Sequence, residues 1–282
     1  MNLLGMMTAV LVATAGLAAP AQADMGCAAA DRRQLSGGCG AVAFAHRGAH
    51  GRTVDENTTE ALEAAYAKRA AMETDVWLTE DDGFLVIHDE TLDHTTSCKG
   101  YVDQWLMADI QAECRTEPNG QRIPDLDRLL DVLSGNAGQR LMVEIKGHGW
   151  YDDDNAPLER LYSVASEAGV LGRVYFTNDA GTGTIETLRD VAPAARTAWK
   201  PAPDETITLQ RAEELSVDAV VAPADEWSSR ALVQSFRSEG FLAWSRAVDD
   251  EATWRRLIRR GVTGVMTHRP GAFLKVCTQM SS

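Results

Sequence analysis

Apolar residues along this chain occur in short runs, and longer amphipathic stretches separate the runs. Runs of three to five residues rich in Val, Ile, Phe and Ala predict β-strands, and from residue 40 onward there are eight of them. The predicted strands are Val42–Ala45, Met72–Val76, Leu141–Ile145, Val174–Phe176, Thr197–Trp199, Ala219–Ala222, Leu242–Trp244 and Gly264–Met266.

The stretches between these runs place apolar residues at helical spacing and predict α-helices. The predicted helices are Thr58–Arg69, Leu126–Leu133, Leu158–Ala168, Thr184–Val191, Ile207–Leu215, Ser229–Glu239 and Ala252–Arg260. Eight strands with intervening helices predict an α/β fold, a (β/α)₈ TIM barrel, which typically needs about 250 residues. With no linker or internal repeat, residues 41–282 of the 282-residue chain are predicted to form one domain.

One apolar run does not fit this alternation. Phe84–Ile87 follows the second predicted strand too closely for a crossover helix, so we expect a small antiparallel hairpin arm there, turning at Gly83. Ser97–Gln121 is the longest stretch without a clear pattern, and we expect an irregular segment that could cover a site.

Candidate chemistry lies at the strand ends, which meet on one face of such a barrel. His46 and His88 each follow a short apolar run, and Glu73 and Asp75 are two residues apart, so both carboxylates face the same side of a strand. Two buried carboxylates repel each other unless a cation lies between them. Together with Glu144, they predict a site for one divalent cation, Ca²⁺ or Mg²⁺, with histidines beside it for proton transfer.

The N-terminus predicts export. Residues 1–23 carry no charge and end in Ala21-Gln22-Ala23, a pattern typical of a signal peptide cleaved near Ala23. Residues 24–40 would then be an extension at the mature N-terminus, and the protein would be secreted or periplasmic without stable membrane insertion. Disulfides are permitted after export. The simplest assignment pairs Cys27 with Cys39 and Cys98 with Cys114, although the sequence does not establish the connectivity.

The net charge of the chain limits the classes of binding partner that we expect. The formal net charge is −14, which argues against nucleic acid or an anionic membrane as the main partner. We expect a small-molecule substrate instead, and positive charge must be concentrated locally if that substrate is a phosphodiester. Arg47 and Lys146 are the candidates for holding phosphate oxygens.

Five ordered motifs resemble the glycerophosphodiester phosphodiesterase family: His46-Arg47-Gly48, Glu56-Asn57-Thr58, Glu73-x-Asp75, His88-Asp89 and Glu144-Ile145-Lys146. The resemblance spans essentially the whole chain after the proposed signal peptide. It implies metal binding by Glu73, Asp75 and Glu144, acid and base catalysis by His46 and His88, and a pocket edge at Glu56 and Asn57. Trp244 could contact the glycerol moiety or pack in the core. The implied reaction hydrolyses a glycerophosphodiester to glycerol 3-phosphate and an alcohol.

The chain also departs from the family pattern, at Asp55, His94, Asn178-Asp179, Ser245-Arg246 and His268. These departures surround the substrate more than the metal. Two alternatives stay open at this point: a lipid phosphodiesterase of the sphingomyelinase D type that forms a cyclic phosphate, and an inactive barrel that only binds phosphodiesters. All the implied histidines and carboxylates are present, which favours an active enzyme.

Overall fold

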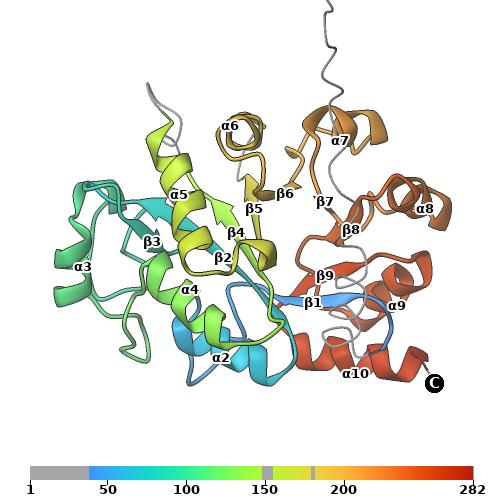
Figure 1. Cartoon of the computed structure of the whole chain (residues 1–282). Coiled ribbons are helices and arrows are strands. Elements are labelled where there is room, and N and C mark those ends of the chain that lie inside the picture. Colours follow the sequence, from blue (N-terminus) through green and yellow to red (C-terminus); the bar gives the residue numbers. More distant parts are fainter. Residues whose placement is uncertain (1–37, 148–154, 179–181, 282) are drawn as a thin grey trace, which may run out of the picture.

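The computed structural model describes residues 38–147, 155–178 and 182–281, and these form a closed barrel of eight parallel strands (Figure 1). Around the barrel each strand pairs with its neighbours in the order β1-β9-β8-β7-β6-β5-β4-β2, and β2 closes the ring on β1. The predicted fold class is confirmed. The barrel strands are β1 Val42–Ala45, β2 Ala71–Leu78, β4 Leu141–Ile145, β5 Val174–Asn178, β6 Arg196–Trp199, β7 Ala219–Ala222, β8 Leu242–Ser245 and β9 Gly264–Thr267.

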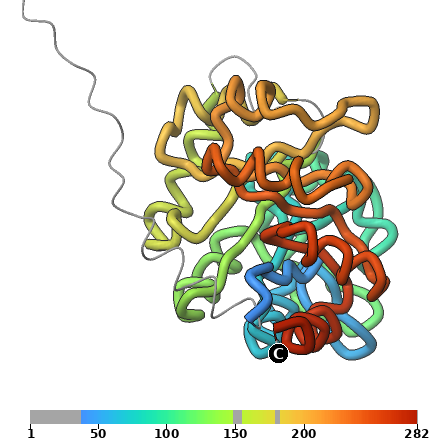
Figure 2. Tube along the Cα trace, turned by 90° about the vertical axis from the view of Figure 1, so that its right-hand side faces the viewer, coloured from blue at the N-terminus to red at the C-terminus, as the bar shows by residue number. Residues whose placement is uncertain are grey.

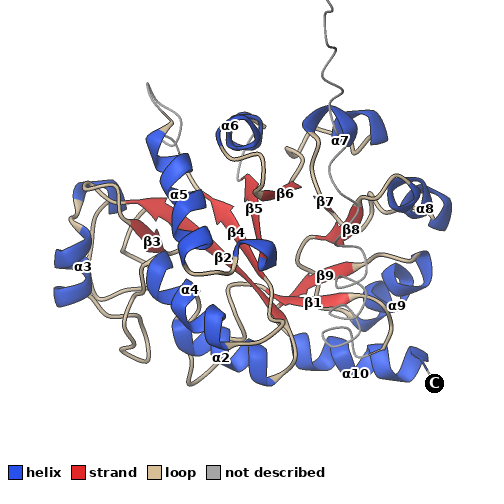
Figure 3. Cartoon of the chain, viewed as in Figure 1, coloured by secondary structure: helices blue, strands red, loops and turns tan. Residues whose placement is uncertain are grey.

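Helices form the outer layer around these strands (Figure 3). An apolar cluster joins the outward faces of the strands to the inward faces of the helices, including Leu62, Leu129, Leu161 and Trp254. Side chains cap the N-termini of several of these helices, as Thr58 does for α2 and Asp125 for α4. The α-helices are α2 Thr59–Ala67, α3 Met107–Glu113, α4 Leu126–Gly135, α5 Ala156–Glu167, α6 Gly183–Val191, α7 Leu209–Leu215, α8 Arg230–Ser238, α9 Glu251–Arg260 and α10 Pro270–Ser281.

The arm predicted after the second strand is present. β3, Phe84–Val86, runs antiparallel to the end of β2. It continues into a small lobe with its own apolar cluster, which contains Leu85, Leu92, Val102 and Ile110. The expectation of an irregular Ser97–Gln121 segment is partly wrong, because α3 and the short 3-10 helix Val102–Gln104 lie within it.

The barrel interior has two layers that follow from the two-residue period of a strand. The lower layer is apolar and contains Phe44, Ala71, Met142, Tyr175, Ala198, Trp244 and Met266. Residues two positions further along the same strands are polar, and they lie at the carboxyl ends of the strands: His46, Glu73, Glu144, Thr177, Lys200, Arg246 and His268. The alternation that fills the core therefore also presents the polar layer at the barrel mouth.

A disulfide joins the two ends of the described chain. Cys39 bonds Cys277, and Cys98 bonds Cys114. The pairing of Cys98 with Cys114 is confirmed, but the pairing of Cys39 with Cys27 is wrong. α10 packs against β1, as Figure 2 shows, and this packing brings Cys277 next to Cys39 although 238 positions separate them. Cys27, the proposed signal peptide and most of the 24–40 extension lie outside the described residues.

Candidate active site

A cavity of about 830 Å³ opens at the carboxyl ends of the barrel strands. Among the residues predicted from the sequence, it is lined by His46, Asp75, His88, Glu144 and Lys146. A volume of this size lies within the range that binds small molecules. These residues come from four separate segments, and the barrel brings them together as expected.

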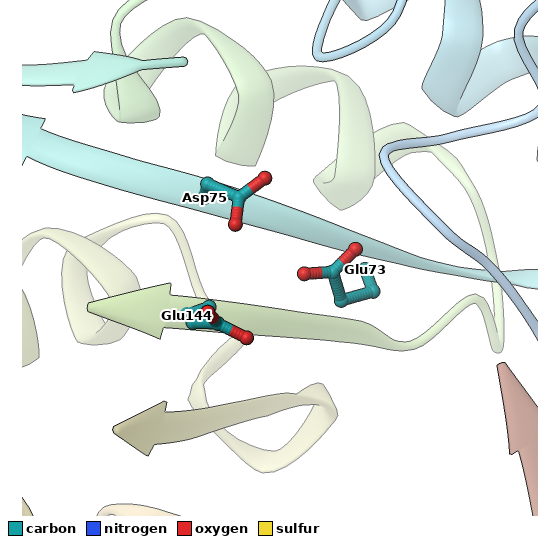
Figure 4. A group of neighbouring side chains, drawn as sticks. All are labelled: Glu73, Asp75 and Glu144. Carbon is teal, nitrogen blue, oxygen red and sulfur yellow. The ribbon is translucent and has the colours of Figure 1, made fainter. Parts of the chain in front are cut away.

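Glu73, Asp75 and Glu144 form an acidic triad (Figure 4), and two of its members, Asp75 and Glu144, line the cavity. Glu73 and Asp75 lie on the same face of β2, and Glu144 lies beside Asp75 on β4. One carboxylate oxygen from each residue lies within 4.8 Å of the other two. All three residues are at most 4 % exposed. Such a set of hard oxygen ligands fits a Ca²⁺ or Mg²⁺ ion.

The carboxylates of the triad differ in how far nearby positive charges offset their negative charge. Burial raises the pKa of Glu73 well above its usual value, and the neighbouring Asp75 and Glu144 raise it further. Burial would also raise the pKa of Glu144, but Lys200 and Lys146 lower it to about 2. The Nζ atoms of Lys146 and Lys200 lie 2.5 and 2.6 Å from the same Glu144 oxygen. No lysine within residues 38–147, 155–178 and 182–281 forms an ion pair with Glu73, so a bound cation would relieve the repulsion there most.

Residues that follow β1 donate hydrogen bonds to the carboxylates of the triad. Arg47 has a φ of 55°, and its backbone N–H donates a 2.9 Å hydrogen bond to Glu73. Its guanidinium faces Glu56 at 2.9 Å rather than the cavity. The Asn57 amide donates to Asp75 at 3.1 Å, while Thr58 rather than Asn57 caps α2. Arg47, Glu56 and Asn57 therefore surround the triad without lining the main cavity.

His46 is held by a chain of side chains that the sequence analysis did not predict. Its Nδ1 lies 2.8 Å from Nε2 of His268, and Nδ1 of His268 lies 2.8 Å from Asp249. Asp249 also accepts hydrogen bonds from the Thr267 hydroxyl and the His268 backbone N–H. Burial and the neighbouring Arg47 lower the pKa of His46 to about 3. His46 is therefore a neutral imidazole whose Nε2 lies on the side of Glu73, at 3.8 Å.

His88 also lines the cavity, and it follows the arm strand β3. Its Nδ1 contacts Asp89 at 2.7 Å, and its backbone carbonyl accepts a 2.9 Å hydrogen bond from the Trp77 indole. His94, another departure from the family pattern, lines the same wall.

Two corrections concern the far side of the cavity. Trp244 is only 2 % exposed, packs against Phe44 and Tyr175 at ring-centroid distances of 4.7 and 4.8 Å, and does not line the cavity. It fits the core-packing alternative rather than a substrate contact. Lys200 and Arg246 line the cavity instead. The sequence analysis missed Lys200, and it named Arg246 only as a departure from the family pattern near the substrate. The signal was present, because each follows a buried barrel residue by two positions.

Comparison with known proteins decides the family. The sequence model of the glycerophosphoryl diester phosphodiesterase family matches residues 46–272. The chain belongs to this family. It is 34% identical over 251 residues to a glycerophosphodiester phosphodiesterase of Caldanaerobacter subterraneus, covering 83% of this chain and 97% of that one. It is 28% identical over 257 residues to one of Bacillus subtilis, covering 83% and 86% respectively.

Solved structures of the family share the fold. A glycerophosphodiester phosphodiesterase from Parabacteroides distasonis superposes with a TM-score of 0.74 at 18% identity, over 85% of this chain and 98% of that one. A phosphodiesterase from Oleispira antarctica, solved with the product sn-glycerol-3-phosphate, gives 0.68 at 20% identity, over 83% and 95%. At these identities the likeness concerns the fold alone.

Proposed function

We propose that this family member hydrolyses glycerophosphodiesters to glycerol 3-phosphate and an alcohol. The observation that carries the proposal is the acidic triad flanked by His46 and His88 at the mouth of the barrel. The relatives from Caldanaerobacter and Bacillus are named for this activity, and the Oleispira relative binds sn-glycerol-3-phosphate.

Glu73, Asp75 and Glu144 would hold one Ca²⁺ or Mg²⁺ ion. Their oxygens lie close enough together to share an ion, and without one the carboxylates repel each other in a buried place. When bound, the ion polarises the phosphoryl group and offsets its negative charge. Lys146, which lines the cavity and lies 3.3 Å from Asp75, is positioned to hold a phosphate oxygen beside the ion.

We assign the proton transfers from the hydrogen bonds of the two histidines. The Asp249 carboxylate accepts a hydrogen bond from Nδ1–H of His268, and in that tautomer Nε2 of His268 is a hydrogen-bond acceptor. Nδ1 of His46 then donates to that nitrogen, so Nε2 of His46 is unprotonated and can accept a proton from the attacking water. His88, supported by Asp89, donates a proton to the oxygen of the leaving alcohol.

A product assay tests this function. The purified protein is incubated with glycerophosphocholine, with and without Ca²⁺ or Mg²⁺, and glycerol 3-phosphate is measured enzymatically. We expect metal-dependent product that is lost in His46→Ala and in His88→Ala. Metal binding without product would instead support the binding-only alternative, and a cyclic phosphate would support the sphingomyelinase D type of reaction.

We also propose that the protein is exported and cleaved near Ala23. Two disulfides support this, because disulfides persist in oxidising compartments. Within the described residues, no helix is both long and apolar enough to span a bilayer. Mass spectrometry of the protein recovered outside the cytoplasm should give a mature N-terminus at Asp24. Intact protein retained in the cytoplasm would contradict export.

A further inference from the structure

Arg246 differs from the other cations that line the cavity. Lys146 and Lys200 both contact Glu144, so their positive charges are matched by the acidic triad. Arg246 forms no ion pair with any carboxylate in the described parts of the chain, and its Nε is buried without a hydrogen-bond partner. The side chain is half-buried, and a guanidinium taken partly out of water without a paired anion is costly, which points to an anion that comes from outside the protein.

The backbone fixes this side chain over the barrel mouth. Arg246 directly follows β8, and its backbone N–H donates a 2.9 Å hydrogen bond to the carbonyl of Ala222 at the end of β7. The guanidinium then crosses to the loop after β6, where Nη2 donates to the carbonyl of Pro201. It therefore lies beside Lys200, whose backbone is held on both sides by the Asn178 amide at 2.9 and 3.0 Å.

Another part of the cavity lining, the acidic wall, carries negative charge from Asp89 and Glu90. Asp89 contacts His88, and the Glu90 side chain is exposed to solvent at the rim. Water therefore solvates Glu90, whereas Arg246 is half-buried. Burial lowers the pKa of Arg246, and the charge of Glu144, which forms no ion pair with it, offsets part of this effect. Arg246 therefore gains more from a charged partner than Glu90 does.

We propose that Arg246, beside Lys200, forms a second anion-binding subsite, and that the preferred substrates are glycerophosphodiesters whose alcohol group carries a further negative charge. The proposal rests on the proposed function and deepens it. A guanidinium binds phosphate oxygens through two parallel N–H donors, so a second phosphodiester on the alcohol suits it well. The acidic wall would repel the same substituent, which directs it toward Arg246.

Two soluble substrates provide a matched test. Glycerophosphoglycerol has a neutral alcohol, and its extended form, glycerophosphoglycerophosphoglycerol, adds only a second phosphodiester to that alcohol. The full-length protein should cleave the extended substrate with a kcat/KM about tenfold higher, the effect of about one charge-assisted hydrogen bond. In Arg246→Gln the ratio of the two kcat/KM values should fall toward one, and in Arg246→Lys it should stay above one.

Lys275→Gln is the control, because it removes one positive charge from an exposed site on α10 that does not line the cavity. Its ratio should equal that of the unmodified protein. A ratio near one in the unmodified protein, an unchanged ratio in Arg246→Gln, or a preference for glycerophosphocholine over both substrates would overturn the subsite while leaving the hydrolase function intact. If neither substrate is cleaved, the proposed function itself fails.

Of two further readouts, the first does not depend on turnover and the second needs no variant. Calorimetry with inactive His88→Ala protein should show tighter binding of the extended substrate, and adding Arg246→Gln should remove the difference. In the unmodified protein the preference should weaken as salt is raised, because the added interaction is between charges. Equal binding of the two substrates, or a preference that salt does not change, would contradict the proposal.

Discussion

Glu73→Gln should separate a metal site from a structural network of charges. Glu73 is 1 % exposed, and its pKa is raised by burial and by two neighbouring carboxylates. In the unmodified protein, a metal ion at a free concentration of about a hundred times its Kd should raise the free energy of unfolding by about 2.7 kcal/mol. For a domain of this size, one kcal/mol shifts Tm by roughly 2–4 °C, so the expected rise in Tm is about 5–10 °C.

In Glu73→Gln one of the three ligands is neutral, so the metal-induced rise in Tm should shrink to less than about half. The metal-free variant should unfold at the same or a higher temperature, because glutamine removes one buried charge and its amide oxygen can still accept the Arg47 N–H. Glu63→Gln, on an exposed position of α2, is the matched control. Calorimetric scans with chelator and with added Mg²⁺ or Ca²⁺ measure both effects.

The reasoning is refuted by either of two results. An equal metal-induced shift in Glu73→Gln and in unmodified protein would show that the ion binds elsewhere. A large loss of stability in the metal-free variant would show that the triad is a structural network that needs the Glu73 charge.

Three further predictions concern other parts of the chain. Asp249→Asn should lower kcat at least about tenfold. The amide would donate to Nδ1 of His268, so His268 would donate from Nε2 to Nδ1 of His46, and His46 would carry its proton on Nε2. Asp250→Asn, which still caps α9, should leave kcat unchanged. Cys39→Ser, which removes the disulfide to α10, should lower the free energy of unfolding by up to about 5 kcal/mol in denaturant titrations. Burial raises the pKa of Asp218, so its carboxyl costs stability as pH rises through that pKa. Asp218→Asn should therefore be at least as stable at pH 7 by thermal scans, with its advantage disappearing at acidic pH where the carboxyl is protonated.

The barrel could be predicted because each strand is a short apolar run that is buried on both faces. The structure mainly extends these runs by one or two residues into polar positions, as at Asn178 and Thr267. α10 was missed as a helix, although Phe273 and Cys277 bury one of its sides against the barrel. Its apolar spacing was present, but nothing in the chain showed that it packs against β1.

The acidic triad and the two histidines could be predicted because they occur in short local motifs. The support of His46 by His268 and Asp249 could not, because the contact joins residues 222 positions apart. The pairing of Cys39 with Cys277 was mispredicted for the same reason, since proximity along the chain favoured Cys27. Lys200 and Arg246 were not predicted to line the cavity because each lies one residue beyond the end of a strand, where the strand pattern stops.

The central claim is metal-dependent hydrolysis of a glycerophosphodiester, and phosphorus NMR of the reaction tests it most directly. Purified protein with Mg²⁺ or Ca²⁺ and glycerophosphocholine should convert the diester signal into that of glycerol 3-phosphate, with no cyclic phosphate at any time. The same sample with chelator, or with His46→Ala protein, should keep the diester. A cyclic phosphate product, or an unchanged diester signal with metal bound, would contradict the account.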